Sequence, residues 1–185
     1  MTIPMVDLRA QYHALRKEIE KAVLSVLERQ QFRGGSDVES FEKALADFAG
    51  VKHALGVSSG TDALLLPLKT LDLQPGDEVI TTPFTFFATA GAIVNAGGIP
   101  VFADILPDTF TVDPQSVRQL ITQKTRCILP VHLYGQCADM DALTGIATEY
   151  NLPIIEDAAQ ALGTRMNNRQ PGNWGIAAAL SFYPT

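Results

Sequence analysis

Two stretches near the start of the chain carry apolar residues at helical spacing. In the first, Leu, Ile, Val and Tyr recur every three or four positions between charged residues, which predicts an amphipathic helix over residues 8–28. In the second, Ser36 and Glu39 have the spacing of a capping box, which predicts that Ser36 caps a helix closed by Gly50. Because the apolar residues of each helix fall on one face, we expect both helices to face the core, and we assign them no chemistry.

From residue 54 onward, short apolar runs alternate with helical patterns. This alternation predicts right-handed crossovers and a mostly parallel sheet with helices on both faces, that is, a three-layer α/β/α fold of the α/β class. Asp113 followed by Pro114 is typical of a helix start, because Asp caps and Pro fits the first turn. The predicted strands are 54–57, 78–81, 100–103, 126–131, 153–156 and 178–182, and the predicted helices are 61–71, 86–96, 114–122 and 140–150.

Length and charge exclude several classes of protein. A chain of 185 residues suits one globular domain with a sizeable core. The net charge of −6 and the lack of a Lys/Arg cluster argue against nucleic-acid or anionic-membrane partners. The apolar runs are broken well short of a membrane span, and the first residues do not have the pattern of a secretory signal.

The cysteines and histidines give no sign of a metal centre. Cys127 and Cys137 have neither metal-ligand nor redox spacing, and two free thiols are typical of a reducing cytoplasm. His13, His53 and His132 are scattered along the chain and lack the short spacing of a zinc site. We therefore expect a cytoplasmic protein without a metal.

The predicted strand at 153–156 ends at two adjacent carboxylates, Glu156 and Asp157. In an open α/β sheet, ligands bind at the carboxyl ends of the strands. Successive side chains of a strand point to opposite faces, so Glu156 and Asp157 are expected in different environments. One of them would then meet a ligand, although from this stretch alone both could equally cap the following helix.

A turn of small residues precedes the predicted helix at 61–71. Ser58, Ser59, Gly60 and Thr61 combine hydroxyls, free amides of a helix N-terminus and a glycine that permits close approach, which together suit a phosphate. The turn has neither the G-x-G-x-x-G nor the Walker A spacing. Taken alone, it is read more simply as an ordinary N-cap.

Two further stretches follow predicted strands. In Thr82–Thr89 an aromatic side chain could cover a planar ligand, but we expect Phe84 and Phe87 to be core residues. The last predicted strand runs into Ser181 and Phe182 without a closing helix. A phosphate turn, an aromatic and a carboxylate together predict pyridoxal phosphate, whose ring nitrogen stays protonated beside an anion.

Six motifs carry a resemblance that extends over essentially the whole chain. They are Asp7-Leu8 with Gln11-Tyr12, Ser59-Gly60-Thr61-Asp62-Ala63-Leu64, Pro83-Phe84-Thr85-Phe86, Val131-His132-Leu133-Tyr134-Gly135-Gln136, Ile155-Glu156-Asp157-Ala158-Ala159-Gln160 and Ser181-Phe182-Tyr183-Pro184-Thr185. In these motifs the chain resembles the DegT/DnrJ-type aminotransferases that act on nucleotide-linked sugars. The resemblance implies the large domain of an aspartate-aminotransferase-like (fold type I) enzyme dependent on pyridoxal phosphate.

The resemblance also implies a role for six residues. Three would hold the cofactor phosphate, through the amides of Gly60 and Thr61, the Thr61 hydroxyl and the hydroxyl of Ser181. Around the ring, Phe86 would stack on the pyridine and Asp157 would pair with its nitrogen. The sixth residue, Gln160, would lie near the 3-hydroxyl, whereas Glu156 receives no role.

By the same resemblance, the catalytic lysine that forms the Schiff base is expected immediately after Thr185, outside residues 1–185. Those residues would then be the N-terminal portion of the large domain, with a smaller C-terminal domain beyond. The family implies glutamate as amino donor, a nucleotide-linked keto-sugar as acceptor, and a homodimer with shared active sites. Histidine in place of that lysine would instead give a sugar 3-dehydratase, and a non-catalytic cofactor- or phosphosugar-binding regulator is a further alternative.

Overall fold

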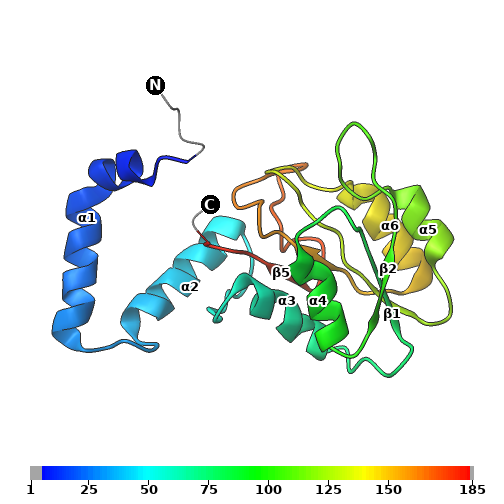
Figure 1. The fold of residues 1–185 in the computed structure, drawn as a ribbon, viewed down its shortest axis with the longest axis horizontal. Coiled ribbons are helices and arrows are strands. Elements are labelled where there is room, and N and C mark those ends of the chain that lie inside the picture. Colours follow the sequence, from blue (N-terminus) through cyan, green and yellow to red (C-terminus); the bar gives the residue numbers. More distant parts are fainter. Residues whose placement is uncertain (1–5, 184–185) are drawn as a thin grey trace.

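The computed structural model describes residues 6–183 and contains helices on both sides of a set of short strands (Figure 1). Most predicted elements from residue 60 onward are confirmed, with ends shifted by a few residues. The helices are α1 (Leu8–Arg29), α2 (Ser36–Ala49), α3 (Gly60–Lys69), α4 (Phe87–Asn95), α5 (Pro114–Leu120) and α6 (Met140–Tyr150). The strands are β1 (Glu78–Thr81), β2 (Ile99–Phe102), β3 (Thr125–Ile128), β4 (Ile155–Asp157) and β5 (Ala177–Ala179).

All strand pairings in the described chain are parallel. One group has the order β2-β1-β3, and the other pairs β4 with β5. Two isolated parallel bridges, Ile128 to Ile154 and Val131 to Asp157, join the groups across the gap. Pro130 interrupts the regular ladder there because it has no N–H to donate. The strand order is therefore β2-β1-β3-β4-β5, with every carboxyl end at the same edge.

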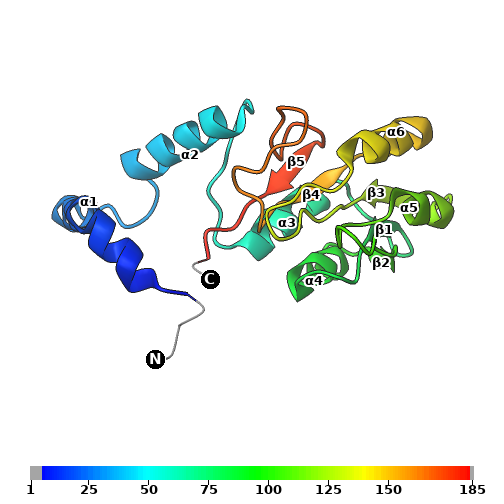
Figure 2. The same cartoon turned by 90° about the horizontal axis from the view of Figure 1, so that it is seen from above.

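The helices divide between the two faces of this sheet. Val79, Cys127 and Ile155 pack with α3 and α4, whereas their strand neighbours Ile80 and Ile154 pack with α5 and α6. This is the alternation that a strand imposes on successive side chains. In Figure 2, α4 and α6 lie on opposite sides of the strands. The predicted three-layer α/β/α architecture is confirmed.

Helix α1 does not face the core, so this part of the prediction is wrong for the single chain. The structure records no buried residue on α1, and its apolar side chains are exposed because no described element covers them. Figure 1 shows α1 at one end of the molecule, apart from the sheet. Helix α2 buries only Ala46 and Ala49, and the side chains of Gln170 and Asn173 donate to carbonyls at its C-terminal end.

Two local predictions in the first third of the chain are also wrong. Ser36 is the first helical residue of α2 rather than its cap; Gly35 takes the cap position with φ of 88°, which a glycine adopts at little cost. Residues 54–57 do not form a strand, because they pair with no strand of the described chain and Leu55 is 81% exposed.

No helix within residues 6–183 is long and apolar enough to cross a membrane.

Helix α3 offers a matched pair of leucines for testing the packing of the sheet. Leu68 is fully buried against β1 and α4, whereas Leu66 on the same helix is 50% exposed. We expect Leu68→Ala to lower the free energy of unfolding by about 2–5 kcal/mol, because it leaves a cavity in the core. Leu66→Ala should change it by less than about 0.5 kcal/mol. Urea denaturation measures both, and equal losses would contradict this packing.

Candidate active site

The turn before α3 has the geometry of an anion site. Ser59 is the N-cap, and its Oγ accepts the Asp62 N–H at 3.1 Å while donating to the Asp62 carboxylate at 3.0 Å. Gly60 and Thr61 are the first two helical residues, so their amides have no acceptor within the helix. Two such amides and the dipole of the helix favour a negatively charged ligand.

Ser181 lies directly against this turn although it is distant in sequence. A Cβ added to Gly60 would lie 3.0 Å from the Ser181 Cβ and 3.2 Å from its Oγ. Parallel pairing of β5 with β4 carries the chain to this point, since Ala179 pairs with Asp157 two residues earlier. The structure thus brings Gly60 and Ser181 together, and only glycine fits at position 60 without displacing the serine.

Asp157 is a buried carboxylate at the end of β4. Its Oδ2 accepts the hydroxyl of Thr89 on α4 at 2.7 Å, and its Oδ1 accepts the Ala159 N–H at 3.2 Å. Burial raises the pKa of Asp157 above its ordinary value, and these two hydrogen bonds, followed by nearby His132, oppose that rise. Thr89 is in turn 2.8 Å from the Thr85 hydroxyl. A carboxylate in this setting would gain from a cationic or N–H partner.

The aromatic side chains after β1 are more exposed than predicted. Phe86 is the N-cap of α4 and is 73% exposed, and its carbonyl accepts the N–H of Thr89. The expectation that Phe84 and Phe87 are core residues is wrong. Phe87 is 81% exposed, and Phe84 stacks on Phe110 at 5.6 Å while remaining partly exposed, because α4 packs on the sheet through Thr89, Ala92 and Ile93 instead.

Gln160 holds a neighbouring turn. Its side-chain oxygen accepts the Tyr134 N–H at 3.2 Å, and its main-chain oxygen accepts the Gly135 N–H at 3.0 Å. Tyr134 has φ of 54°, a left-handed conformation that costs energy for a bulky residue and needs such support. With its oxygen engaged, the amide nitrogen of Gln160 is its donor for any ligand.

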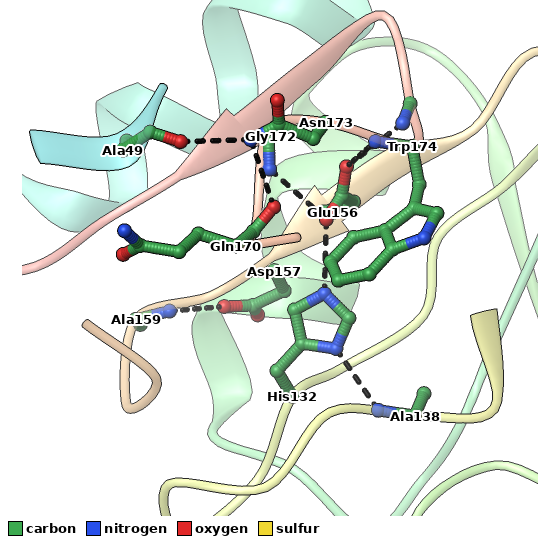
Figure 3. Close-up of polar contacts among 11 residues, drawn as sticks. Ala49, His132, Ala138, Glu156, Asp157, Ala159, Gln170, Gly172, Asn173 and Trp174 are labelled. Carbon is green, nitrogen blue, oxygen red and sulfur yellow. Dashed lines mark hydrogen bonds and ion pairs between the residues drawn. The ribbon is translucent and has the colours of Figure 1, made fainter. Parts of the chain in front are cut away.

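Glu156 and Asp157 face opposite sides of β4, as the strand alternation predicted (Figure 3). The Glu156 side chain is fully buried and is hydrogen-bonded to His132 and to three main-chain amides. Sequence reasoning gave no role to Thr89 or His132, although both lie inside stretches that it singled out. For Thr89, the available signal was its four-residue spacing from Thr85, which lets a hydroxyl just before α4 meet one in the first turn of the helix.

These contacts join most of the predicted site residues along one edge of the sheet. Helix α3 meets the segment that follows β5 at Gly60 and Ser181, and α4 meets β4 at Thr89 and Asp157. Amides and hydroxyls suited to an anion therefore lie on the same edge as a buried carboxylate. The arrangement therefore suits an anion at the turn and a cationic or N–H partner at the carboxylate.

Residues 13–185 match the DegT/DnrJ/EryC1/StrS aminotransferase family. The chain belongs to that family. It is 48% identical over its whole length to a "Pleiotropic regulatory protein" of Geobacillus stearothermophilus, covering 50% of that protein. It is 42% identical over 99% of its length to the UDP-2-acetamido-2-deoxy-3-oxo-D-glucuronate aminotransferase of Pseudomonas aeruginosa, covering 51% of it. The chain thus spans about half the length of these relatives.

Solved structures agree with this family and with the predicted fold. DesV of S. venezuelae, solved in complex with a ketimine intermediate, matches 98% of this chain with a TM-score of 0.94 and 45% identity, over 49% of its own chain. NtdA of Bacillus subtilis matches 99% with a TM-score of 0.92 and 37% identity, over 41% of its own chain, and contains the bound cofactor PMP. Aminotransferases of this family use pyridoxal phosphate.

The raised pKa of Asp157 predicts a pH-dependent stability. Since its pKa is higher in the folded state, the folded chain binds more protons than the unfolded chain between the two pKa values. The contribution of Asp157 to the free energy of unfolding therefore falls as the pH rises through that interval. Above the folded-state pKa the buried carboxyl group is ionised, and the loss of stability has reached its full value. Asp157→Asn should accordingly make the cofactor-free protein more stable at neutral pH.

Urea denaturation between pH 3 and pH 8 measures this difference, which should shrink as the pH approaches the ordinary range for a carboxyl group, about 4. Asp108→Asn, at an exposed aspartate, is the matched control and should show no comparable gain. A gain for Asp157→Asn that stays constant with pH would contradict the assignment.

Proposed function

We propose that the full-length protein transfers an amino group from glutamate to the keto group of a nucleotide-linked sugar. The observation that carries the proposal is the joining of two parts of the site at one sheet edge. The turn that begins α3 meets Ser181 there, just after β5, and the buried carboxylate of Asp157 lies on the neighbouring strand β4. A phosphorylated pyridine cofactor needs both parts.

At the phosphate end, Gly60 and Thr61 would bind through their amides, and Thr61 and Ser181 through their hydroxyls. Ser59 supports this arrangement, because its own hydroxyl is already used in capping α3 and so leaves the first two amides free for a ligand. The closeness of Ser181 to Gly60 allows both to contact one phosphate.

At the ring end, Asp157 would hold the proton of the pyridine nitrogen, and Thr89 would orient its carboxylate. When bound, pyridoxal phosphate supplies an electron-accepting ring. The protonated ring nitrogen would take the place of the water that Asp157 loses on burial. This positive charge would lower the pKa of Asp157, because it offsets the desolvation that raises that pKa. Phe86 would cover one ring face, and Gln160 would donate its amide to the 3-hydroxyl.

The names of the relatives support the class of substrate. The Pseudomonas protein is named for a UDP-linked 3-oxo sugar, and a Streptomyces venezuelae relative, 44% identical over 98% of this chain and 48% of its own length, is named a transaminase of a dTDP-linked amino sugar. A keto-sugar acceptor is the corresponding proposal here. We further propose a homodimer with shared active sites, in which a second copy covers the exposed apolar face of α1.

In this proposal residues 1–185 are the first part of the large domain. The lysine that binds the cofactor follows Thr185, and a smaller domain follows in turn. A second candidate function is a regulator on the same scaffold, which is favoured by the name of the 48% identical Geobacillus relative. Such a regulator needs the phosphate turn, but it needs no covalent bond to the cofactor.

Visible absorbance of the purified full-length protein separates these candidates. A cofactor bound to lysine should give a visible absorbance band from its conjugated C=N linkage, and borohydride should remove that band irreversibly. Glutamate should also shift the band by converting the cofactor to its amino form. Absence of a borohydride-sensitive band would rule out the lysine transaminase and leave the dehydratase or the regulator.

A pair of glycines tests the phosphate turn. We expect Gly60→Ala to weaken binding of pyridoxal phosphate about tenfold or more, because the new Cβ displaces Ser181 from the turn. Gly145→Ala on α6 is the control, since a Cβ there meets nothing within 4 Å and a helix interior favours alanine. Equilibrium dialysis of both variants gives the affinities, and equal affinities would contradict the assigned phosphate turn.

A further inference from the structure

Glu156 has a set of contacts that the proposed transamination does not use. Its Oε2 lies 3.0 Å from His132 Nε2 and accepts the Gly172 N–H at 3.1 Å. Its Oε1 accepts the N–H groups of Trp174 at 3.2 Å and Gly175 at 2.8 Å. The side chain is fully buried, and each of its oxygens thus faces two hydrogen-bonding groups (Figure 3).

The hydrogen bonds of His132 determine which of its ring nitrogens carries the proton. Its Nδ1 accepts the Ala138 N–H at 3.1 Å, so the neutral ring must carry its hydrogen on Nε2, which then donates to Glu156. The main-chain N–H of His132 also donates to the Asp157 carbonyl at 2.8 Å. His132 is therefore attached to both members of the carboxylate pair, to Glu156 by its ring and to Asp157 by its backbone.

The three amides that face Glu156 belong to the turn that leads into β5. Gly175 approaches the strand so closely that an added Cβ would lie 2.4 Å from the Ile154 carbonyl oxygen. The next residue, Ile176, donates its N–H to that same carbonyl at 2.8 Å, and the β4–β5 pairing starts one residue later. The register of β5, and with it the place of Ser181, thus follows directly from the turn held by Glu156.

We propose that Glu156 is a positioning residue for the cofactor site, which sets Asp157 through His132 and sets Ser181 through the turn at 172–175. The proposal rests on the proposed function, because it concerns the same cofactor. The Glu156 carboxylate, on the face of β4 opposite to Asp157, would then align both the ring end and the phosphate end of the site. Glu156 itself touches neither the cofactor nor the substrate.

Glu156→Gln tests this role with almost no change in size. The glutamine has one acceptor and one NH₂ donor, whichever way it is turned. If the NH₂ replaces Oε1, it faces the amides of Trp174 and Gly175; if it replaces Oε2, it faces Gly172 and His132. Moving the His132 hydrogen to Nδ1 would let Nε2 accept that NH₂, but the hydrogen would then face the Ala138 N–H, so one opposed pair of donors replaces another. Every arrangement leaves buried donors opposed, and this cost is what the variant measures.

We expect Glu156→Gln to weaken binding of pyridoxal phosphate to the full-length apoprotein about tenfold, measured by equilibrium dialysis. Glu149→Gln, at an exposed glutamate paired with Arg118, is the matched control and should bind as the wild type does. Long-range ¹H–¹⁵N spectra of the histidine side chains should show His132 with its hydrogen on Nε2 in the wild type, and a mixed or reversed tautomer in Glu156→Gln. This second readout does not depend on activity.

Two substitutions at His132 keep the proposal testable if Glu156→Gln does not fold. Glutamine at position 132 can place its NH₂ near Nε2 and keep the donor to Glu156, whereas asparagine places its oxygen near Nδ1 and keeps only the acceptor for Ala138. We expect His132→Gln to retain more cofactor affinity than His132→Asn. The reverse order, or equal losses, would overturn the proposal.

The outcomes separate the two proposals. If the wild type does not bind pyridoxal phosphate, the proposed function fails and this inference fails with it. If the wild type binds and Glu156→Gln binds equally well, only the positioning role is overturned. A wild-type His132 with its hydrogen on Nδ1 would also overturn the positioning role, whatever the affinities are.

Discussion

The site depends on one constraint, which is that adjacent residues of a strand face opposite ways. At the end of β4 this places Asp157 on the face of the sheet that α4 covers and Glu156 on the opposite face. Glu156 is matched by four hydrogen-bonding groups of the protein, so its burial is compensated. Asp157 has two, and burial raises its pKa. The protein thus satisfies one carboxylate and leaves the other short of partners.

The parallel sheet converts this local asymmetry into a site. Because all strand pairings of the described chain are parallel, the ends of β1, β4 and β5 lie on the same edge as the start of α3. Helices α3 and α4 cover one face and meet that edge with amides and hydroxyls, while α5 and α6 fill the other face with apolar side chains. The polar groups suited to a ligand are therefore confined to one edge of the sheet.

The sequence predicted what depends on period and on local capping. Alternation of apolar runs gave the sheet and its layers, and the separation of Glu156 from Asp157 followed from strand geometry. Contacts between distant segments were not accessible, such as Thr89 with Asp157 or His132 with Glu156, because no local pattern encodes them. The strand predicted at residues 54–57 and the core-facing α1 were wrong for a related reason. An apolar pattern shows that a surface favours burial, but it does not show which segment buries it.

The closeness of Gly60 and Ser181 has a consequence for assembly. The two residues are far apart in sequence, and β5 is an edge strand that is attached to the described sheet only through β4. Contacts of such long range form late, because closing the intervening loop costs entropy before the contact is made. The anion turn is thus incomplete in a partly synthesised chain, and a phosphate ligand would stabilise only molecules whose last strand has docked.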